Sequence, residues 1–492
     1  MLMYLKTVEQ VSFVLRYALE GETYESFLKF QNVESTTAEA LFKCLCETLK
    51  TWGLDIKTLR GQGYDGASNM SGRYNGLKTK VLNENPKALY VHCSNHCLNL
   101  VLVAAFKSNI LCKNFFGIVV ERLYVIIEAS PKRDSIFVRC QKERNIQHPS
   151  SLKRLSETRW ASHCDSLRTI EKTLPALLDA LEEIAEEEHD NKIVSNAIGL
   201  LESVSTFDFI AAFTVLKDIL ETIRVASDAL QERGIAIDTA LQLIDNAEKA
   251  LADKRSDEYY KTLMSNAKKL ASKCEIPTEF KQHRQRRRKQ QSGELAGDEV
   301  LTPEESFKAN VFYGCIDICR MQIKERFAAN RDILKAFRVL LTPSLMKKRD
   351  NETVTKELED LSKVYGSGPH PDIDPATEIP QNASAQDMFK YLFQSNLRFV
   401  IRNLYRLYAI FCTIPATSVE TERSFSKLKI IKDYRRSTMG QDRLSGLAIL
   451  SIERNIAKSI SFDHAIQTFA EMRPRKIHSF NLLFRKLWSI ET

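Results

Sequence analysis

The spacing of apolar residues changes near residue 106, and this change limits the fold more than any other feature of the sequence. Before it, apolar residues alternate with others over short runs, as from Val11 to Tyr17, which is typical of strands. After it, they recur every third or fourth residue, as from Leu174 to Ile184 and from Leu216 to Ile223, which is typical of helix-packing faces. The pattern therefore predicts an α/β part followed by a long all-helical part.

Element boundaries are clearest in the α/β part. The runs QVSFVLRYA, SFLKFQNV and LYVHC are predicted strands, and the last leads into a helix through NHCLNLVLVAAF. The segment TTAEALFKCLCETLKTWG is a predicted helix that Thr36 or Thr37 caps and Gly53 ends. Across the chain we expect four parts, which are residues 1–106, 107–386, 387–458 and a tail at 459–492.

Composition restricts the class of protein. The chain has 492 residues, 43% of them hydrophobic and 27% charged, as in ordinary globular proteins. It has no run of eighteen apolar residues and no secretory signal, so we expect an intracellular protein without a membrane span. The 11 cysteines are scattered and no CxxC pair occurs, so we expect reduced thiols and no standard zinc finger.

Most of the net positive charge lies in one tract. The net charge is +8, and subtracting the six Lys and Arg of KQHRQRRRK (281–289) leaves +2. This tract, with Arg284, Arg286, Arg287 and Arg288, predicts either nuclear import or contact with DNA phosphates, or else a solvated loop. Residues 281–300 are a predicted loop, and residues 365–386, which hold four prolines, a predicted linker.

Three short stretches carry candidate chemistry, and each has a structural alternative. In GQGYDGASNMSG (61–72), Asp65 follows a predicted strand, where it is either an active carboxylate or an Asx-turn residue. In VHCSNHCLNLVL (91–102), His92, Cys93, His96 and Cys97 form either a metal site or a packed strand–helix junction.

The third stretch spans residues 414–455. Thr417 or Ser418 is a predicted cap for a helix with Glu422 in its first turn, and Phe425 is expected to face the core. In isolation, Glu422 beside Arg423 is interpreted as part of a solvated helix with a local ion pair, and not as a functional carboxylate.

Together with ETRWASH (157–163), these three stretches resemble the hAT superfamily of transposases from about residue 7 to residue 458. The resemblance is greatest to the transposase-derived group that includes the zinc-finger MYM-type proteins. It implies an RNase H-like α/β domain interrupted by a large all-α insertion. In that family two aspartates and a glutamate bind two divalent metals, which suits Mg²⁺.

The resemblance assigns roles to five positions of this sequence. Asp65 stands at the family's second aspartate and Glu422 at its glutamate. Cys93 and His96 match its CxxH element, and Trp160 matches the insertion-domain tryptophan that stacks near a flipped base.

One departure from the family is the absence of its first aspartate. No Asp or Glu precedes Glu9, so we expect the first strand, its carboxylate and the family's N-terminal zinc finger to be missing, and the chain to be inactive in strand cleavage. Either the chain folds poorly, or MLMYLK partly fills the gap, or the sequence is an incomplete gene model, which is the reading we favour.

The resemblance makes residues 387–458 the hAT dimerisation region. Their helices have more apolar side chains than one face needs, including Phe399, Leu404, Leu407 and, further on, Phe425, which predicts either deep core or a subunit interface. We expect a nuclear protein that pairs with itself, has DNA as a candidate partner, and needs no membrane, small-molecule substrate or cofactor, except Mg²⁺ where the triad is intact.

Three functions stay open. The chain is a non-catalytic transposase relic, a fragment of an active Mg²⁺-dependent transposase, or a helical scaffold that has lost nucleic-acid binding. Salt-dependent DNA binding separates the first from the third.

Overall fold

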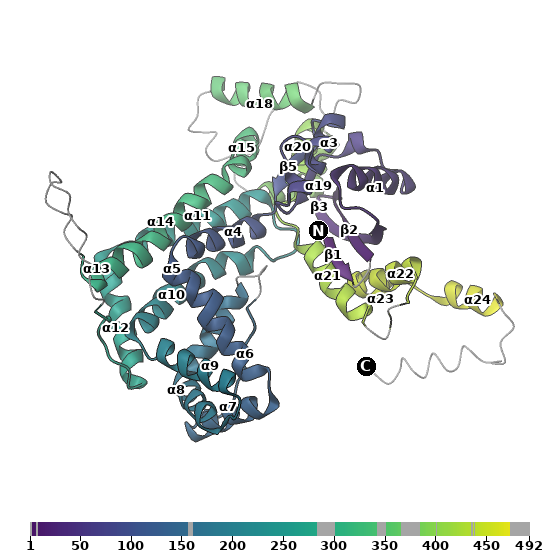
Figure 1. Cartoon of the computed structure of the whole chain (residues 1–492). Helices are drawn as coiled ribbons and strands as arrows, with labels where there is room; N and C mark the ends of the chain where they lie inside the picture. Colours follow the sequence, from purple (N-terminus) through teal and green to yellow (C-terminus); the bar gives the residue numbers. More distant parts are fainter. Residues whose placement is uncertain are drawn as a thin grey trace. The chain divides into compact units, whose positions relative to one another are not determined.

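The computed structural model describes residues 2–5, 8–155, 161–282, 301–341, 351–365, 384–399, 401–433, 436 and 438–472. It divides into two compact units. The larger contains Arg16–Glu25 and Val33–Val419, and the smaller contains Leu2–Leu15, Ser26–Asn32 and the chain from Glu420 on. Figure 1 labels their elements.

The strands form two small sheets. The first has the order β1-β2-β3 and the second pairs β4 with β5. The α/β elements are β1 (Leu2–Leu5), β2 (Val8–Leu19), β3 (Glu22–Val33), α1 (Ala38–Thr51), η1 (Ile56–Thr58), β4 (Gly61–Tyr64), α2 (Ser68–Ser71), α3 (Leu77–Glu84), β5 (Leu89–His92) and α4 (Ser94–Lys107). The predicted strands and helices of this part are confirmed.

Residues before β2 form a strand, as in the alternative in which MLMYLK partly fills the gap left by the family's first strand. Residues Leu2–Leu5 form β1, which pairs antiparallel with β2 from Leu2↔Val11 to Leu5↔Val8. The sequence LMYL suits a strand because its residues are apolar and one is aromatic, and pairing satisfies backbone groups along β2 that would otherwise be an open edge. The absence of a strand before β2 is therefore not confirmed.

Helix α1 begins and ends as predicted. The Thr37 side chain accepts a hydrogen bond from Ala40 N, which caps the helix. After its C-terminal end, Gly53 adopts φ +67, a conformation that costs a glycine little. The cap and the glycine together fix the length of α1.

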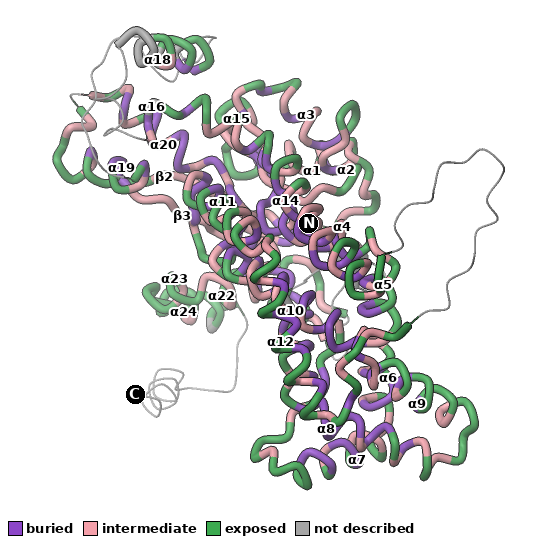
Figure 2. Tube along the Cα trace, turned by 90° about the vertical axis from the view of Figure 1, so that its left-hand side faces the viewer, coloured by how far each residue is buried: buried purple, intermediate pink, exposed green. Residues whose placement is uncertain are grey.

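Helices make up the middle of the chain. They are α5 (Ile110–Asn114), the π-helical η2 (Phe115–Val120), α6 (Glu121–Glu128), α7 (Pro131–Glu143), α8 (Ala161–Glu187), α9 (Asn191–Val204), α10 (Phe207–Ala229), α11 (Ile237–Lys254), α12 (Asp257–Lys273), α13 (Pro303–Phe307), the π-helical η3 (Lys308–Tyr313), α14 (Gly314–Arg326), α15 (Ala328–Ala336), α16 (Arg338–Leu341) and α18 (Asn351–Tyr365). Within the larger unit, α7 and α8 lie at the end of this bundle away from α15 (Figures 1 and 2).

Helices α8 and α10 supply much of the core of the larger unit. The apolar positions from Leu174 to Ile184 and from Leu216 to Ile223 are buried, which confirms both predicted packing faces. Figure 2 shows the buried stretches along these helices in purple. Among the described helices, no single one is both long and apolar enough to cross a membrane; α9 and α10 reach that length and apolarity only as a pair bent by 72°.

The last elements are α19 (Ala385–Gln394), η4 (Leu397–Phe399), α20 (Arg402–Thr413), α21 (Val419–Ile431), α22 (Gln441–Ile452), α23 (Arg454–Ser459) and α24 (Asp463–Glu471). The tip of the β2–β3 hairpin packs on α19. Gly21 has φ +77, and a Cβ there would lie 2.7 Å from Cβ of Phe393, so only glycine fits this turn.

Candidate functional site

The carboxyl ends of β4 and β5 lie side by side. These strands pair in parallel from Gly61↔Leu89 to Tyr64↔His92, so Asp65 and Cys93 leave the sheet at the same edge. In α/β proteins this edge is where ligands commonly bind. It is the part of the larger unit that brings together the most candidate residues.

The glycines of this motif are explained by close packing. A Cβ at Gly61 would lie 2.6 Å from Cδ of Pro415, and one at Gly63 would lie 2.9 Å from its Cγ. A Cβ at Gly66 would lie 2.6 Å from Cε1 of His92. A side chain at any of the three positions would displace a neighbour, so the glycines allow the proline and the imidazole to approach the strand and its turn.

Asp65 is half-buried in the turn after β4. Its Oδ1 accepts a hydrogen bond from Ala67 N at 3.4 Å, which is the Asx-turn contact that the sequence also allowed. Burial lowers the pKa values of the neighbouring His92 and His96, and the negative charge of Asp65 opposes that lowering only in part.

The two histidines form a pair beside this carboxylate. Their ring centroids are 5.4 Å apart. Burial, followed by the neighbouring His96, lowers the pKa of His92 to about 4, and burial also lowers the pKa of His96. Both rings are therefore neutral at pH 7, and His92 Nε2 is buried with no hydrogen-bond partner among the described residues.

Sequence reasoning missed two contributors to this site. His92 was considered only as one of four residues of a metal site or a packed junction, and its position next to Asp65 at the end of the neighbouring strand was not predicted. Arg326, at the end of α14, acts on both histidines by lowering their pKa values. No local pattern could have linked an arginine from the helical part to β5.

Cys93 has a structural contact. It is buried, and its Sγ accepts a hydrogen bond from Ser418 N at 3.2 Å. Ser94 N donates to Ala416 O at 3.1 Å, so the start of α4 is joined to residues 416–418. Burial raises the pKa of Cys97 to about 12, which keeps its thiol protonated at pH 7. These contacts fit the packed strand–helix junction that was one of the two readings.

Glu422 lies in the smaller unit, in the first turn of α21, and is half-buried. The helix is anchored by Ser424, whose Oγ lies 2.6 Å from that of Ser12, and by Phe425, whose ring centroid lies 5.7 Å from that of Phe30. Asp65 belongs to the larger unit, and its convergence with Glu422 on a Mg²⁺ site stays a prediction.

No other metal site is evident in the described ranges. There, no three His, Cys, Asp or Glu side chains come close enough together to hold a metal ion. The Asp65 carboxylate can accept hydrogen bonds, and the neutral imidazoles of His92 and His96 each have one nitrogen that accepts and one N–H that donates.

The residues predicted for other roles have different positions. Trp160 and the arginines Arg284, Arg286, Arg287 and Arg288 lie outside the described residues. Of the four residues predicted for dimerisation, Leu404, Leu407 and Phe425 are at most 4% exposed, inside the cores of their own units, and Phe399 is 65% exposed. Only Phe399 therefore offers a side chain to a partner without rearrangement.

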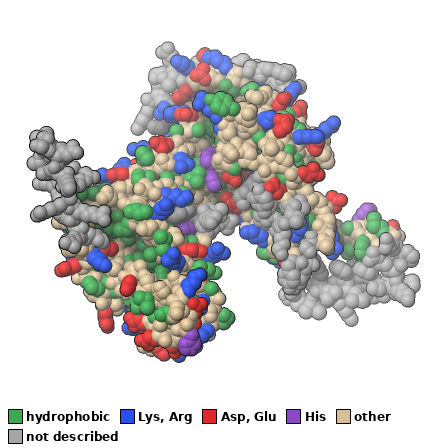
Figure 3. Space-filling model, viewed as in Figure 1, with side chains coloured by type: hydrophobic (Ala, Val, Ile, Leu, Met, Phe, Trp, Pro, Cys, Tyr) green, Lys and Arg blue, Asp and Glu red, His purple; other side chains and the backbone are tan. Residues whose placement is uncertain are grey.

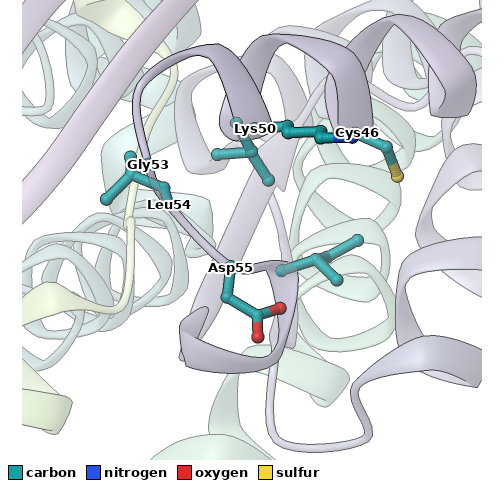
Figure 4. A pocket seen from close by; sticks show the side chains of 7 residues that line it. Cys46, Lys50, Gly53, Leu54 and Asp55 are labelled. Atoms are coloured by element: carbon teal, nitrogen blue, oxygen red, sulfur yellow. The ribbon is translucent and has the colours of Figure 1, made fainter.

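One hollow lies apart from the candidate site, at the end of α1. Its volume is about 370 Å³, and Cys46, Leu49, Lys50, Gly53, Leu54, Asp55 and Ile56 line it (Figure 4). Asp55 Oδ1 already accepts a hydrogen bond from Lys57 N at 2.9 Å. No candidate catalytic residue faces this hollow, so we assign it no function.

Two family models match parts of the chain. Residues 5–76 match the ZMYM1/FAM200 RNase-like domain, and residues 379–456 match the hAT family C-terminal dimerisation region. The first segment holds Asp65 and the second holds Glu422, so both inherited carboxylate positions lie within matched segments.

Curated relatives align along nearly the whole chain. A human protein named "52 kDa repressor of the inhibitor of the protein kinase" is 24% identical over 95% of this chain and 62% of its own length. The mouse protein of that name is 24% identical over 92% of this chain and 60% of its own length. The chain spans about three-fifths of these relatives. The chain is thus similar to the hAT family in two segments, an RNase-like segment at residues 5–76 and a C-terminal dimerisation region at residues 379–456.

Proposed function

We propose that this chain is a transposase-derived nuclear protein that self-associates through its C-terminal dimerisation region, binds DNA through its helical part, and does not cleave DNA. The observation that carries the proposal is the match of residues 379–456 to the hAT dimerisation region. The name of the human and mouse relatives describes a repressor, which supports a regulatory rather than a catalytic role for this chain.

The strand β1 supports the absence of catalysis. In the family, a strand before the one that resembles β2 contributes the first aspartate. Here the strand that pairs with β2 is LMYL, and it has no carboxylate. The strand β1 therefore adds no third carboxylate to Asp65 and Glu422, and a two-metal site needs carboxylate ligands to hold the metals that stabilise the attacking and leaving oxygens.

Helix α12 supports DNA binding. Figure 3 shows Lys and Arg interspersed with Asp and Glu over the visible described surface, so charge alone marks no broad basic face. On α12, however, Lys268, Lys269 and Lys273 are exposed, and none of them pairs with an acidic side chain among the described residues. Ser265 and Ser272 lie on the same exposed side and can donate hydrogen bonds to phosphate.

The place of α12 in the sequence adds to this argument. It ends shortly before the tract KQHRQRRRK (281–289), so the lysine face and the arginines Arg284, Arg286, Arg287 and Arg288 belong to one stretch of chain. Such a tract also supports nuclear import. A lysine in the last helical turn also stabilises the helix itself, because its charge interacts favourably with the helix dipole. A binding measurement therefore has to separate helix stabilisation from contact with DNA.

DNA binding is tested by the salt dependence of affinity for duplex DNA. Each phosphate contact contributes about 0.9 to the slope of log K against log salt. Replacing Lys268, Lys269 and Lys273 by Gln should reduce that slope by about 2 to 3. Gln in place of Lys57, Lys113 and Lys172, three lysines remote from α12 in sequence, is the matched control and should leave the slope unchanged. An unchanged slope in the α12 variant contradicts the proposed surface.

Catalysis is tested with the same purified chain. Incubated with a DNA duplex that carries a transposon end, in Mg²⁺ or Mn²⁺, it should leave both strands intact. Cleavage that disappears in both Asp65→Asn and Glu422→Gln would overturn the non-catalytic assignment and favour the second candidate, a fragment of an active Mg²⁺-dependent hAT transposase. Retention of the two carboxylates at family positions is the observation that supports this second candidate.

A further inference from the structure

We propose that the exposed apolar residues of α22, α23 and the residue after α23, which are Gly446, Ile449, Leu450, Ile456 and Ile460, form the surface through which two copies of this chain associate. The proposal rests on the self-association proposed above and identifies where on the chain it takes place. We call these five residues the α22–α23 face; Figure 1 shows both helices in the last third of the colour scale.

The orientation of α22 is fixed by its other side. Leu444 and Ala448 are fully buried in the core of the smaller unit. Gln441 Nε2 donates to Phe30 O at 2.6 Å, and Ser445 Oγ donates to the same oxygen at 3.1 Å. Buried side chains and hydrogen bonds to β3 thus hold one side of the helix, and α22 cannot rotate to cover its opposite side.

That opposite side is apolar and open to solvent. Ile449 is 40% exposed, Leu450 48%, Ile456 53% and Ile460 54%. Single exposed aliphatic side chains are common on protein surfaces, but four within a short stretch of two successive helices are not. Apolar side chains exposed in such numbers favour association, because covering them removes apolar surface from water.

Gly446 supplies a second, independent observation. It lies in the middle of α22, where glycine is among the least favourable residues for a helix. A Cβ built there would meet nothing within 4 Å, so packing within the described chain does not require a glycine. A glycine on an exposed helix face permits another backbone to approach closely. Two helices from separate molecules could therefore pack against each other at Gly446.

A second copy of the chain is the occupant that fits best. The family's dimerisation region, residues 379–456, includes Gly446, Ile449, Leu450 and Ile456. An interface between identical copies places the same patch on both sides, so an uncharged apolar patch is complementary to itself. None of the five residues has a charge to offer to phosphates; Arg454 and Lys458 on α23 are exposed, so the test below also measures DNA affinity.

The test measures the dissociation constant of self-association of the full chain by sedimentation equilibrium. The wild-type chain should sediment as a dimer at tens of micromolar. The double variant Ile449→Glu with Ile456→Glu should weaken association at least about 100-fold, because two carboxylates on each copy would be buried without partners. Gly446→Leu should weaken it at least about tenfold while the thermal midpoint of the monomer is unchanged or higher, since leucine favours the helix.

Val225→Glu is the matched control. Val225 is 72% exposed on α10, outside the dimerisation region, and its replacement should leave the dimer intact. If the wild-type chain is monomeric, both the proposed self-association and the α22–α23 face are wrong. If the wild-type chain is dimeric and both face variants remain dimeric with native circular dichroism, only the face is wrong. If the face variants stay dimeric but bind DNA more weakly than the wild type, the α22–α23 face is a DNA-binding surface and the proposed dimer contact is wrong.

Discussion

Gly66 lies against the imidazole of His92, where a Cβ atom would stand 2.6 Å from Cε1 of the ring. In Gly66→Ala, the added methyl has to displace either the ring or the turn after β4. We expect this to lower the free energy of unfolding by about 1–3 kcal/mol, the usual cost of an added methyl in a packed site. Urea denaturation of the purified variant measures it.

Gly199→Ala is the control for this substitution. Gly199 lies in α9, and a Cβ there would meet nothing within 4 Å, so alanine should raise the free energy of unfolding by about 0.5–1 kcal/mol through helix propensity. If Gly66→Ala is as stable as the wild type, the close approach of Gly66 to His92 does not exist in solution.

The pH dependence of stability should report the buried imidazole of His92. Burial and the neighbouring His96 lower its pKa from 6.5 to about 4, with Arg326 and Lys78 acting in the same direction and Asp65 against them. Unfolding returns the ring to water and its ordinary pKa, so the unfolded state binds more protons between the two values. The contribution of this group is therefore fully present above pH 6.5 and is lost as the pH falls from 6.5 to 4.

The measurement compares denaturation midpoints at pH 7.5 and pH 5 for wild type and His92→Gln. The variant should lose less stability on acidification than the wild type. His189→Gln, at an exposed histidine after α8, should behave as the wild type does. An identical loss of stability in His92→Gln and wild type would show that His92 is not held neutral by burial.

A buried ion pair joins the two strands of the β2–β3 hairpin near its tip. Arg16 and Glu25 are 2.7 Å apart, and their side chains are only 7% and 11% exposed. Arg16 also donates to Cys412 O at 2.9 Å and to Gly234 O at 3.1 Å, so it fixes the hairpin to two other segments of the larger unit. Glu25→Gln leaves the guanidinium buried without its counter-charge and should cost about 3–5 kcal/mol in unfolding free energy.

The pair of Arg144 and Asp179 provides the comparison. It has the same separation of 2.7 Å but is 50% and 34% exposed, so Asp179→Asn should cost less than about 1 kcal/mol. Both variants are measured by chemical denaturation. Equal costs would mean that burial does not determine the strength of these pairs.

Local signals in the sequence predicted the elements well. Thr37 and Gly53 act within a few residues of the helix that they delimit, and the period of the apolar residues reports which face of α8 and α10 is buried. Asp65 at the end of β4 followed from the same local logic. The short β1 was only one of several alternatives, because a four-residue strand is stabilised by pairing with β2 and not by its own sequence.

Properties that depend on distant contacts could not be predicted. Leu404 and Leu407 lie on an apolar helix, and composition alone cannot separate a core helix from an interface helix. Arg326 reaches the histidines only because α14 packs in the same unit as β5. The α22–α23 face was missed because its isoleucines and leucine are spread over two helices, and only the structure shows that they are exposed together.

Descent from a hAT transposase requires Asp65 and Glu422 to share one site, and the separation of these two residues tests it most directly. Spin labels introduced through unnatural amino acids at the exposed neighbours Ala67 and Ser426 allow a pulsed electron paramagnetic resonance measurement of their distance. If Asp65 and Glu422 bind the same two metal ions, which lie about 4 Å apart in such sites, the two labels should be separated by a single distance on the order of 20 Å. A broad distribution centred well beyond that value would contradict the shared site and the proposed ancestry with it.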